Sequence, residues 1–297
     1  MSGIEVRNLS KRYGSLTAVD DLSFTVRPGA VTAFLGPNGA GKTTTMRMMI
    51  DHVAPTSGSA TIGGRRYRDL PRPTTVVGAV FDTASFHPQH SARDHLRIYA
   101  AMGGHPDGRV DHLLSLLGLA GAAGRRTGGY STGMRQRLNL ATALLGDPRV
   151  LLLDEPGNGL DPEGLAWLRS FLRELAGEGR TILVSSHVLS EVQQAADDVV
   201  VIGRGRLLAA GSLRDLPGTA QDVLVRTPDA TELCPILARE AHRVDATGPE
   251  DLRVRGLDPA RVAGLAAAHG LRVHGLTTED RSLEELFLDL TGERTHT

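Results

Sequence analysis

The sequence is poor in cysteine, in lysine and in long apolar runs. Its single cysteine, Cys234, excludes an internal disulfide and fits a reducing compartment. No apolar run approaches the roughly 20 residues that a membrane-spanning helix requires, and the N-terminal stretch lacks the apolar core of a signal peptide. With a net charge of −1 at pH 7, the chain also lacks the basic excess typical of nucleic-acid binders. We therefore expect neither a transmembrane segment nor a nucleic-acid partner.

Lysine occurs at only two positions, Lys11 and Lys42, in a chain that otherwise uses arginine. Lys42 lies in "GPNGAGKTTT", which matches G-x-x-x-x-G-K-[ST] from Gly36 to Thr43. The preceding "AVTAFLG" predicts a buried strand and the following "TTTMRMMIDHV" a helix, the context that this phosphate-binding loop requires. Glycines let backbone N–H groups approach a polyphosphate closely. We expect Lys42 to reach the β- and γ-phosphates, where the planar arginine is aimed differently, and the Thr43 hydroxyl to hold Mg²⁺.

Two carboxylates follow another apolar stretch, "VLLLDEP", which predicts a strand buried on both faces. In proteins with a phosphate-binding loop, an acid at the end of such a strand binds Mg²⁺ directly or through water, and Asp154 fits this role. Glu155, one residue further, is placed to polarise a water that attacks the γ-phosphate. We prefer these roles to a solvated loop end because the phosphate loop lies upstream.

Strands that alternate with helices predict an open α/β sheet before a boundary near "LPGTAQ". We assign a first domain to residues 1–216, with a helical subdomain at about 85–147, and a second domain to residues 217–297. The second domain follows the order β-α-β-β-α-β, which predicts a small α+β, ferredoxin-like fold. A last amphipathic helix is expected in "SLEELFLDLTG" and should pack onto another surface.

Three segments in this order, "GPNGAGKTTT", "YSTGMRQRLNLATALLGDPRVLLLDEPGNGLDP" and "SSHVLSEV", resemble the ATPase subunit of an ABC transporter. The resemblance covers about residues 3 to 215 and implies a P-loop NTPase (RecA-like) core with an antiparallel β subdomain and a helical subdomain. The "YSTGM" signature directly before the acidic strand distinguishes this family from other P-loop proteins. ATP and Mg²⁺ are the cofactors that it implies.

The resemblance also assigns further site residues. Tyr13 falls where an aromatic ring stacks on adenine, although a half-buried strand tyrosine is the alternative. Ser131 and Gly133 open a helix that touches the γ-phosphate of ATP held by the other subunit, and Asp161 lies in a loop that communicates across that dimer. His187 corresponds to the family's switch histidine, which hydrogen-bonds the γ-phosphate. The phosphate cradle consists of Gly36, Asn38, Gly39, Ala40, Gly41, Lys42, Thr43 and Thr44.

Two departures from the family pattern stand out. The usual LSGGQ reads "YSTGM" here, so that Thr132 and Met134 replace a glycine and a glutamine. The family's glutamine after the strand "VVGAVF" is replaced by Asp82, because Gln89 comes several residues too late. An acid at this place resembles bacterial exporters of antibiotics and peptide bacteriocins. A slipped alignment, with Asp82 as an ordinary loop residue, is the alternative.

The functional expectation is an Mg²⁺-dependent ATPase that energises a separate transmembrane permease at the cytoplasmic face of the membrane. A second ATPase subunit, identical or different, completes the site. The ending "SLEELFLDLTG" resembles the small domain of drug-exporter subunits, which favours export of drugs, antibiotics or peptides over import. The main alternative is a soluble ABC ATPase acting on ribosomes or nucleic acid, but the single cassette and the short spacing before the signature speak against it. The signature and His187 speak against a third alternative, a P-loop kinase.

Overall fold

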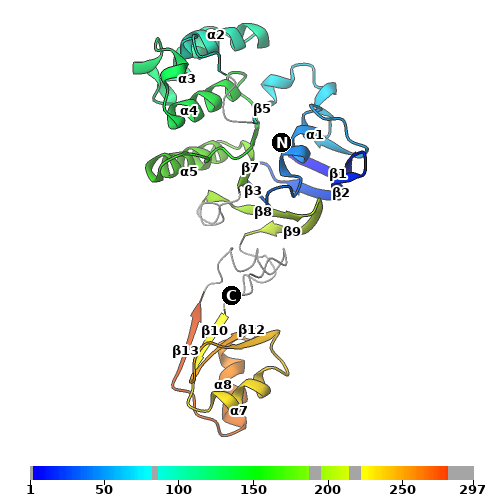
Figure 1. Cartoon of the computed structure of the whole chain (residues 1–297), viewed down its shortest axis with the longest axis vertical. Helices are drawn as coiled ribbons and strands as arrows, with labels where there is room; N and C mark the ends of the chain where they lie inside the picture. Colours follow the sequence, from blue (N-terminus) through cyan, green and yellow to red (C-terminus); the bar gives the residue numbers. More distant parts are fainter. Residues whose placement is uncertain (1–2, 82–85, 187–194, 214–221, 280–297) are drawn as a thin grey trace. The chain divides into compact units, whose positions relative to one another are not determined.

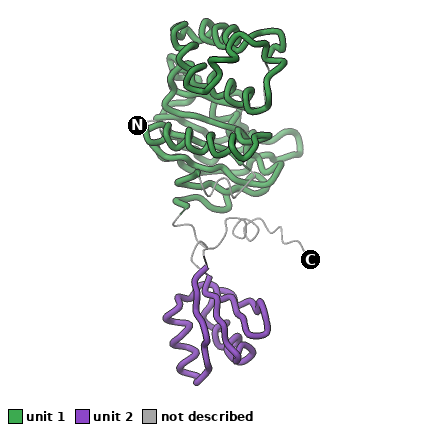
Figure 2. The backbone as a smooth tube through the Cα atoms, turned by 90° about the vertical axis from the view of Figure 1, so that its left-hand side faces the viewer, with its two compact units in different colours: residues 1–213 green, residues 214–297 purple. Residues whose placement is uncertain are grey.

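The structure is a computed structural model and describes residues 3–81, 86–186, 195–213 and 222–279. It divides into two compact units, residues 1–213 and residues 214–297 (Figure 2). Among the described residues, no helix is long and apolar enough to cross a membrane. The first unit carries the predicted phosphate loop and both predicted acids.

A six-stranded sheet forms the centre of the first unit (Figure 1). Neighbouring strands run parallel, except that the last strand is antiparallel to its neighbour. The order across the sheet is β5 (Val77–Val80), β6 (Val150–Leu153), β7 (Thr181–Ser186), β3 (Val31–Leu35), β8 (Asp198–Gly203) and β9 (Arg206–Ser212). The expected α/β architecture is therefore confirmed.

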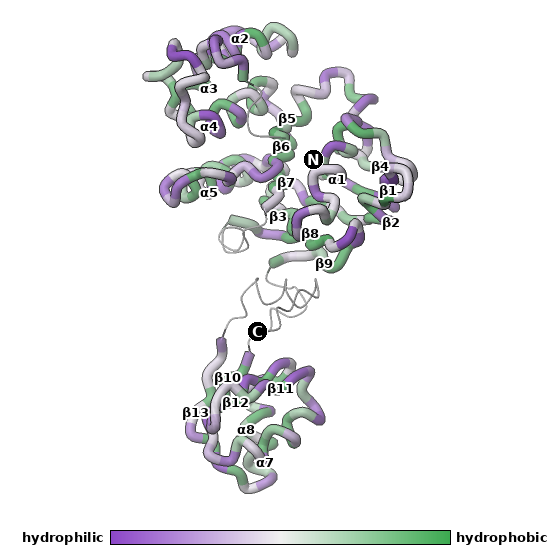
Figure 3. The backbone as a smooth tube through the Cα atoms, in the orientation of Figure 1, coloured by the Kyte–Doolittle hydropathy of each residue, from purple (hydrophilic) through white to green (hydrophobic). Residues whose placement is uncertain are grey.

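Both faces of this sheet are buried, and Figure 3 colours β6 and β8 as largely apolar. Successive side chains of a strand point to opposite faces. Leu151 and Leu153 of β6 accordingly belong to a core shared with α4 (Thr132–Ala143) and α5 (Pro162–Gly177). Val150 and Leu152 belong to a second core on the other face, shared with α1 (Lys42–Met49) and an antiparallel sheet.

That antiparallel sheet has the order β2 (Leu16–Val26), β1 (Ile4–Tyr13) and β4 (Ser57–Ile62). β4 pairs with the distant β1, with Ile62 opposite Ile4. The pairing buries both isoleucines in the core that α1 shares.

The helical subdomain contains α2 (Ala92–Gly103), α3 (Gly108–Leu116) and α4. Ser91 starts α2 with a capping box, in which its hydroxyl accepts the Asp94 N–H and the Asp94 side chain faces back. Where α4 meets α5, the Arg137 guanidinium lies 4.2 Å from the ring centre of Trp167, which also stacks on Phe171. Short 3₁₀ turns occur at η1 (Tyr67–Asp69), η2 (Pro73–Thr75), η3 (Ala120–Ala122) and η4 (Thr127–Gly129).

The second unit shows the predicted element order: β10 (Asp222–Arg226), α7 (Ala230–Leu237), β11 (Arg243–Ala246), β12 (Asp251–Arg255), α8 (Pro259–Ala268) and β13 (Gly275–Glu279). Its antiparallel sheet has the order β11-β12-β10-β13, and it has an apolar core of its own, against which Cys234 packs. Just before the last strand, the Arg272 carbonyl accepts the Thr227 hydroxyl and its guanidinium pairs with Asp229. The expected final helix lies outside the described residues.

Candidate nucleotide site

The phosphate loop connects the end of β3 to the start of α1, as predicted. Gly41 precedes the helix with a φ of 102°, and a Cβ atom there would lie 2.5 Å from the Ala18 carbonyl oxygen. A Cβ atom at Gly36 would lie 2.6 Å from the Ile202 carbonyl oxygen. Only glycine fits either position without a shift of backbone, so the loop's shape depends on both.

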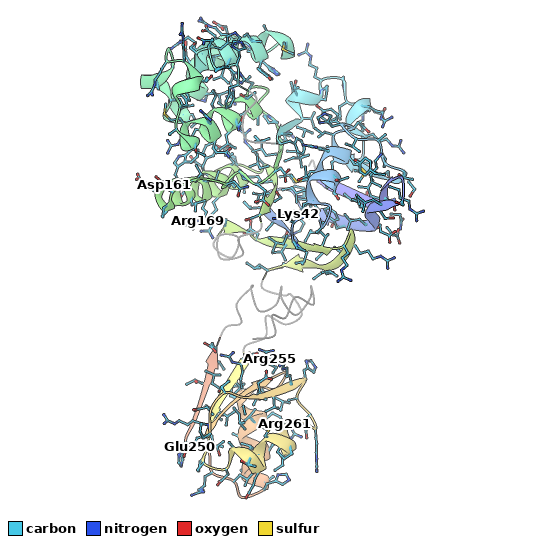
Figure 4. The ribbon with its side chains drawn as sticks, in the orientation of Figure 1. Lys42, Asp161, Arg169, Glu250, Arg255 and Arg261 are labelled. Carbon is cyan, nitrogen blue, oxygen red and sulfur yellow. The ribbon has the colours of Figure 1, made fainter. Side chains whose placement is uncertain are left out.

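Lys42 is almost completely buried at the first turn of α1 (labelled in Figure 4). Its Nζ donates to the Gly36 carbonyl at 2.6 Å, and more weakly to the Pro37 carbonyl at 3.4 Å. Glu155 Oε1 lies 3.8 Å from the same Nζ. Burial lowers the pKa of Lys42, while Glu155 and Asp154 act in the opposite direction. The ammonium group is therefore held between the loop and the acidic pair, as a phosphate-binding lysine requires.

Asp154 follows β6 directly, and its carboxylate accepts hydrogen bonds from two hydroxyl groups. Its Oδ2 accepts the Thr43 hydroxyl at 2.7 Å and its Oδ1 accepts the Ser185 hydroxyl at 2.6 Å. The Asp154 N–H continues the sheet by donating to the Val80 carbonyl at 2.8 Å. Thr43 and Asp154, which are distant in sequence, are thus brought together as the sequence predicted.

These two side chains fit a magnesium ion. Mg²⁺ prefers oxygen ligands, keeps several waters, and is usually bound by one or two protein groups plus substrate phosphates. A hydroxyl and a carboxylate joined at 2.7 Å beside the phosphate loop provide such a donor set. In the part of the chain that the structure describes, no group of three or more His, Cys, Asp or Glu side chains could hold a metal by itself. A hydroxyl and one carboxylate suit a metal whose other ligands are water and nucleotide phosphates.

Glu155 has an unusual backbone conformation, with a φ of 50°. Non-glycine residues seldom adopt this left-handed region, and functional sites are among the places where they do. Its N–H donates to the Ser185 hydroxyl at 2.8 Å. Its side chain is about one-fifth exposed, at 22%. The carboxylate thus lies near Lys42 and remains accessible to solvent, as a general base for a bound water must be.

Ser131 and Asp161 cap helices rather than contact the phosphate loop. Ser131 accepts the Met134 N–H at the start of α4, and Asp161 accepts the Gly164 N–H at the start of α5. No hydrogen bond or ion pair among the described residues joins either side chain to residues 36–44. Figure 4 labels Asp161 at the start of α5, apart from Lys42. The predicted contributions of Ser131, Gly133 and Asp161 to a nucleotide of another subunit stay predictions.

Tyr13 ends β1 with a side chain that is 48% accessible, which agrees with a half-buried strand tyrosine and also leaves the ring free to stack on a base. The Lys11 ammonium lies 4.8 Å from its ring centre. The exposed ring leaves adenine stacking as a prediction. Asp82 and His187 lie outside the described residues, so their predicted roles are likewise untested.

Ser185 is the residue of this site that the sequence analysis did not single out. It lies in β7, between the strand that carries the loop and the strand that carries the acids, and it is completely buried. Its signal was present in "TILVSSH", where a hydroxyl interrupts an apolar strand just before its end. Recognising its partner required the pairing of β6 with β7, which the sequence alone does not supply.

Comparison with known proteins agrees with this geometry. A family model described as ABC transporter matches residues 19–158, and one described as a domain of unknown function matches residues 221–284. The chain is 35% identical to the bacitracin transport ATP-binding protein BcrA of Enterococcus faecalis, covering 97% of this chain and 96% of that protein.

It is 36% identical to the Nod factor export ATP-binding protein I of Ralstonia nicotianae, covering 97% and 94% of the two chains. A solved structure of an ATP binding subunit of an ABC transporter superposes with a TM-score of 0.65 at 30% identity, over 71% of this chain and 90% of that one. The two curated relatives match nearly the full length of the chain, and the solved subunit shares the fold over 71% of it. The chain therefore belongs to the ABC transporter family, as one of its ATP-binding subunits.

Proposed function

We propose that this subunit hydrolyses ATP with Mg²⁺ to energise a separate transmembrane permease, as part of a bacterial exporter of drugs, antibiotics or peptides. It would act at the cytoplasmic face of the membrane. The observation that carries the catalytic part is the convergence of Lys42, Thr43, Asp154 and Glu155 at one edge of the central sheet. The direction of transport rests on relatives whose names describe bacitracin transport and Nod factor export.

Each residue would have a distinct task in hydrolysis. The loop N–H groups and Lys42 bind the phosphates, and Thr43 and Asp154 hold Mg²⁺, which offsets phosphate charge when bound. Glu155 orients a water and accepts its proton as the water oxygen bonds to the γ-phosphorus and the bond to ADP breaks. Tyr13 would stack on adenine, and His187 would hydrogen-bond the γ-phosphate.

The active form would be a dimer of ATPase subunits. Ser131, Gly133 and Asp161 lie at the starts of α4 and α5 without a contact to their own phosphate loop. A Cβ atom at Gly133 would meet only ordinary van der Waals contact, 3.6 Å from a Leu160 methyl. The fold of this chain thus does not demand glycine there, which supports a requirement that comes from another molecule.

A permease would dock beside the helical subdomain. A hollow of about 360 Å³ lies between β5 and the end of α2, lined among others by Tyr99 and Met102. Met102 is 78% exposed, although apolar. We propose a cytoplasmic helix of the permease as the occupant, with Asp82, which follows the β5 segment, pairing with one of its basic residues. Asp82 would take the place of the family's glutamine in this coupling.

A pair of variants tests the catalytic assignment. Glu155→Gln keeps the shape of the side chain but removes the base, so we expect kcat to fall by roughly a hundredfold or more while ATP binding persists. Lys42→Ala should instead weaken nucleotide binding itself. Binding of a fluorescent ATP analogue and phosphate release measure the two effects separately. Normal turnover by Glu155→Gln would reassign the base.

Co-purification tests the transport assignment. A transporter subunit should co-purify from membranes with a small integral membrane protein, and the complex should be lost on substitution of Met102 by Glu. The matched control is Leu116→Glu, which changes an exposed leucine that is not part of the hollow. Recovery of ribosomes or nucleic acid instead of a membrane protein would favour the alternative function.

A further inference from the structure

We propose that Ser185 is a positioning residue of the ATPase site, which sets the orientation of both Asp154 and Glu155. The inference deepens the proposed function and rests on its assignment of Asp154 to the metal and Glu155 to the attacking water. Ser185 touches neither phosphate nor metal in this role. It acts through the two acids, by one hydrogen bond to each.

Strand register places the hydroxyl at the acids. In the parallel pair β6 and β7, Leu153 lies opposite Val184, so the next residues along the two strands are Asp154 and Ser185. On the other side of β7, Ser185 pairs with Phe34 of β3, the strand that leads into the phosphate loop. Ser185 is thus fixed from both sides within the central sheet, which makes it a rigid support for mobile catalytic groups.

The Ser185 hydroxyl bonds to both acids at once. Its proton goes to Asp154 Oδ1 at 2.6 Å, and its oxygen accepts the Glu155 N–H at 2.8 Å. A serine hydroxyl has one donor and two acceptor lone pairs, so a single atom can serve both acids at once. Because Thr43 donates to Oδ2 of Asp154, the carboxylate is held at both oxygens and cannot turn freely about its last bond.

The second bond supports a strained backbone. Glu155 has a φ of 50°, and such conformations persist only where the surroundings enforce them. The backbone pairing of β6 with β7 ends at Leu153 and Val184. Two residues after Leu153, the Glu155 N–H donates to the Ser185 hydroxyl instead of to a backbone carbonyl. Without that acceptor, the peptide group before Glu155 would be free to rotate. The Glu155 carboxylate, whose direction depends on this peptide group, would then lose its position.

Space around Ser185 permits a conservative replacement. A cavity of about 190 Å³ is lined by Ser185, together with Glu155, Ala33 and Val184. A threonine keeps the hydroxyl that makes both hydrogen bonds and adds a single methyl group beside this cavity. This separates loss of the hydroxyl from a general disturbance of the buried strand.

The experiment compares Ser185→Ala and Ser185→Thr with wild type. In Ser185→Ala we expect kcat to fall about 10- to 100-fold, the usual effect of removing a partner that orients a metal ligand. The Mg²⁺ concentration for half-maximal binding of a fluorescent ADP analogue should rise severalfold, a readout that does not depend on turnover. Ser185→Thr should stay within about threefold of wild type in both, since the hydroxyl is kept.

Thr32→Val provides the matched control. Thr32 is a buried hydroxyl residue in the neighbouring β3, and its Oγ1 has no hydrogen-bond partner among the described residues. Its loss should leave kcat and the Mg²⁺ dependence unchanged. If Ser185→Ala does not fold, Ser185→Cys takes its place, because a thiol is a weak donor in a similar volume.

The outcomes separate the two hypotheses. Wild-type kcat and Mg²⁺ dependence in Ser185→Ala would overturn the inference. Equal defects in Ser185→Ala and in a folded Ser185→Thr would also overturn it, and so would an equal defect in Thr32→Val. Absence of Mg²⁺-dependent hydrolysis in wild type would instead refute the proposed function itself, and full hydrolysis by Glu155→Gln would refute only its assignment of Glu155 as the base. A defect in Ser185→Ala with rescue by threonine supports the positioning role.

Discussion

Thr142 determines which nitrogen of His95 carries a proton. Its hydroxyl donates its only hydrogen to the Leu138 carbonyl at 2.9 Å, so it must accept from His95 Nε2, 3.1 Å away. The His95 ring is buried between Phe86 and Tyr99. Burial lowers the pKa of His95 to about 4, and the charge of His90 adds to this effect. The ring is therefore neutral at physiological pH, although an unperturbed histidine titrates near pH 6.5.

This neutrality predicts a pH dependence of stability. Between about pH 6.5 and 4 the unfolded chain binds a proton at position 95 that the folded chain does not, so the free energy of unfolding falls as the pH is lowered through this window. His95→Gln keeps an N–H donor for Thr142 but does not titrate. Urea unfolding should show a shallower pH dependence in this variant, by up to about one bound proton.

His105→Gln is the control: it replaces another histidine of the same subdomain, and the pH dependence of unfolding should change less than in His95→Gln. An unchanged slope in His95→Gln would mean that the ring is already protonated in the fold.

At the scale of elements, the unusual signature residue Thr132 is matched by a glycine in the loop before α5. Gly159 has a φ of 74°, and a Cβ atom there would lie 2.9 Å from the Thr132 methyl group. Thr132 begins α4, so the contact joins the starts of two helices that carry predicted dimer residues. Gly159 thus leaves room for the methyl group of Thr132, which stands where the family signature usually has glycine.

We expect Gly159→Ala to destabilise the first unit by roughly 1–3 kcal/mol, from the left-handed backbone together with the clash. In a Thr132→Ser background, which removes only the methyl group, the cost should be lower by about 0.5 kcal/mol or more. Denaturant unfolding of the four chains of this cycle measures the difference.

Gly64→Ala measures the cost of the left-handed backbone without a clash, since Gly64 has a φ of 81° and no atom lies within 4 Å of a Cβ placed there. Strict additivity of the two changes would show that the methyl group and the glycine are independent.

Local patterns predicted the elements of the site, and long-range pairing determined the rest. The phosphate loop, the buried strand before Asp154 and the helix that starts at Ser131 each depend on neighbours in sequence, and all were predicted correctly. Ser185 as the partner of Asp154, and Gly159 as the partner of Thr132, depend on which segments the fold brings together. The pairing of β4 with β1 has the same origin. No periodicity within one segment carries that information.

At the scale of the whole molecule, the two units have separate apolar cores. In the second unit, Asp229 accepts two hydrogen bonds from the Arg272 guanidinium, at 2.6 and 3.1 Å, and one from its N–H at 2.9 Å. These bonds, the side-chain bond first, lower the pKa of Asp229 to about 2. The ionised Asp229 carboxylate, at the start of α7, thus holds Arg272 and the segment before β13 in place by hydrogen bonds.

Asp229→Asn should therefore lower the melting temperature of the second unit at pH 7 by a few degrees, and leave ATP hydrolysis unchanged. In wild type, this contribution is complete above about pH 4 and is lost as the pH falls toward 2, because the unfolded carboxylate protonates first. Calorimetry of the full chain measures both transitions.

Asp251→Asn, an exposed acid in the same unit, is the control. A shift of the first unit's transition in Asp229→Asn would contradict the independence of the two cores.

The stacking of Arg137 on Trp167 has a practical consequence. Trp167 is the single tryptophan of the chain, and it lies on α5 of the core while Arg137 lies on α4 of the helical subdomain. A guanidinium 4.2 Å from an indole ring alters its emission, and any tilt of one helix against the other changes that distance. Trp167 emission therefore reports on the contact between α4 and α5. Steady-state and stopped-flow fluorescence of the unlabelled chain can show whether nucleotide binding changes this contact.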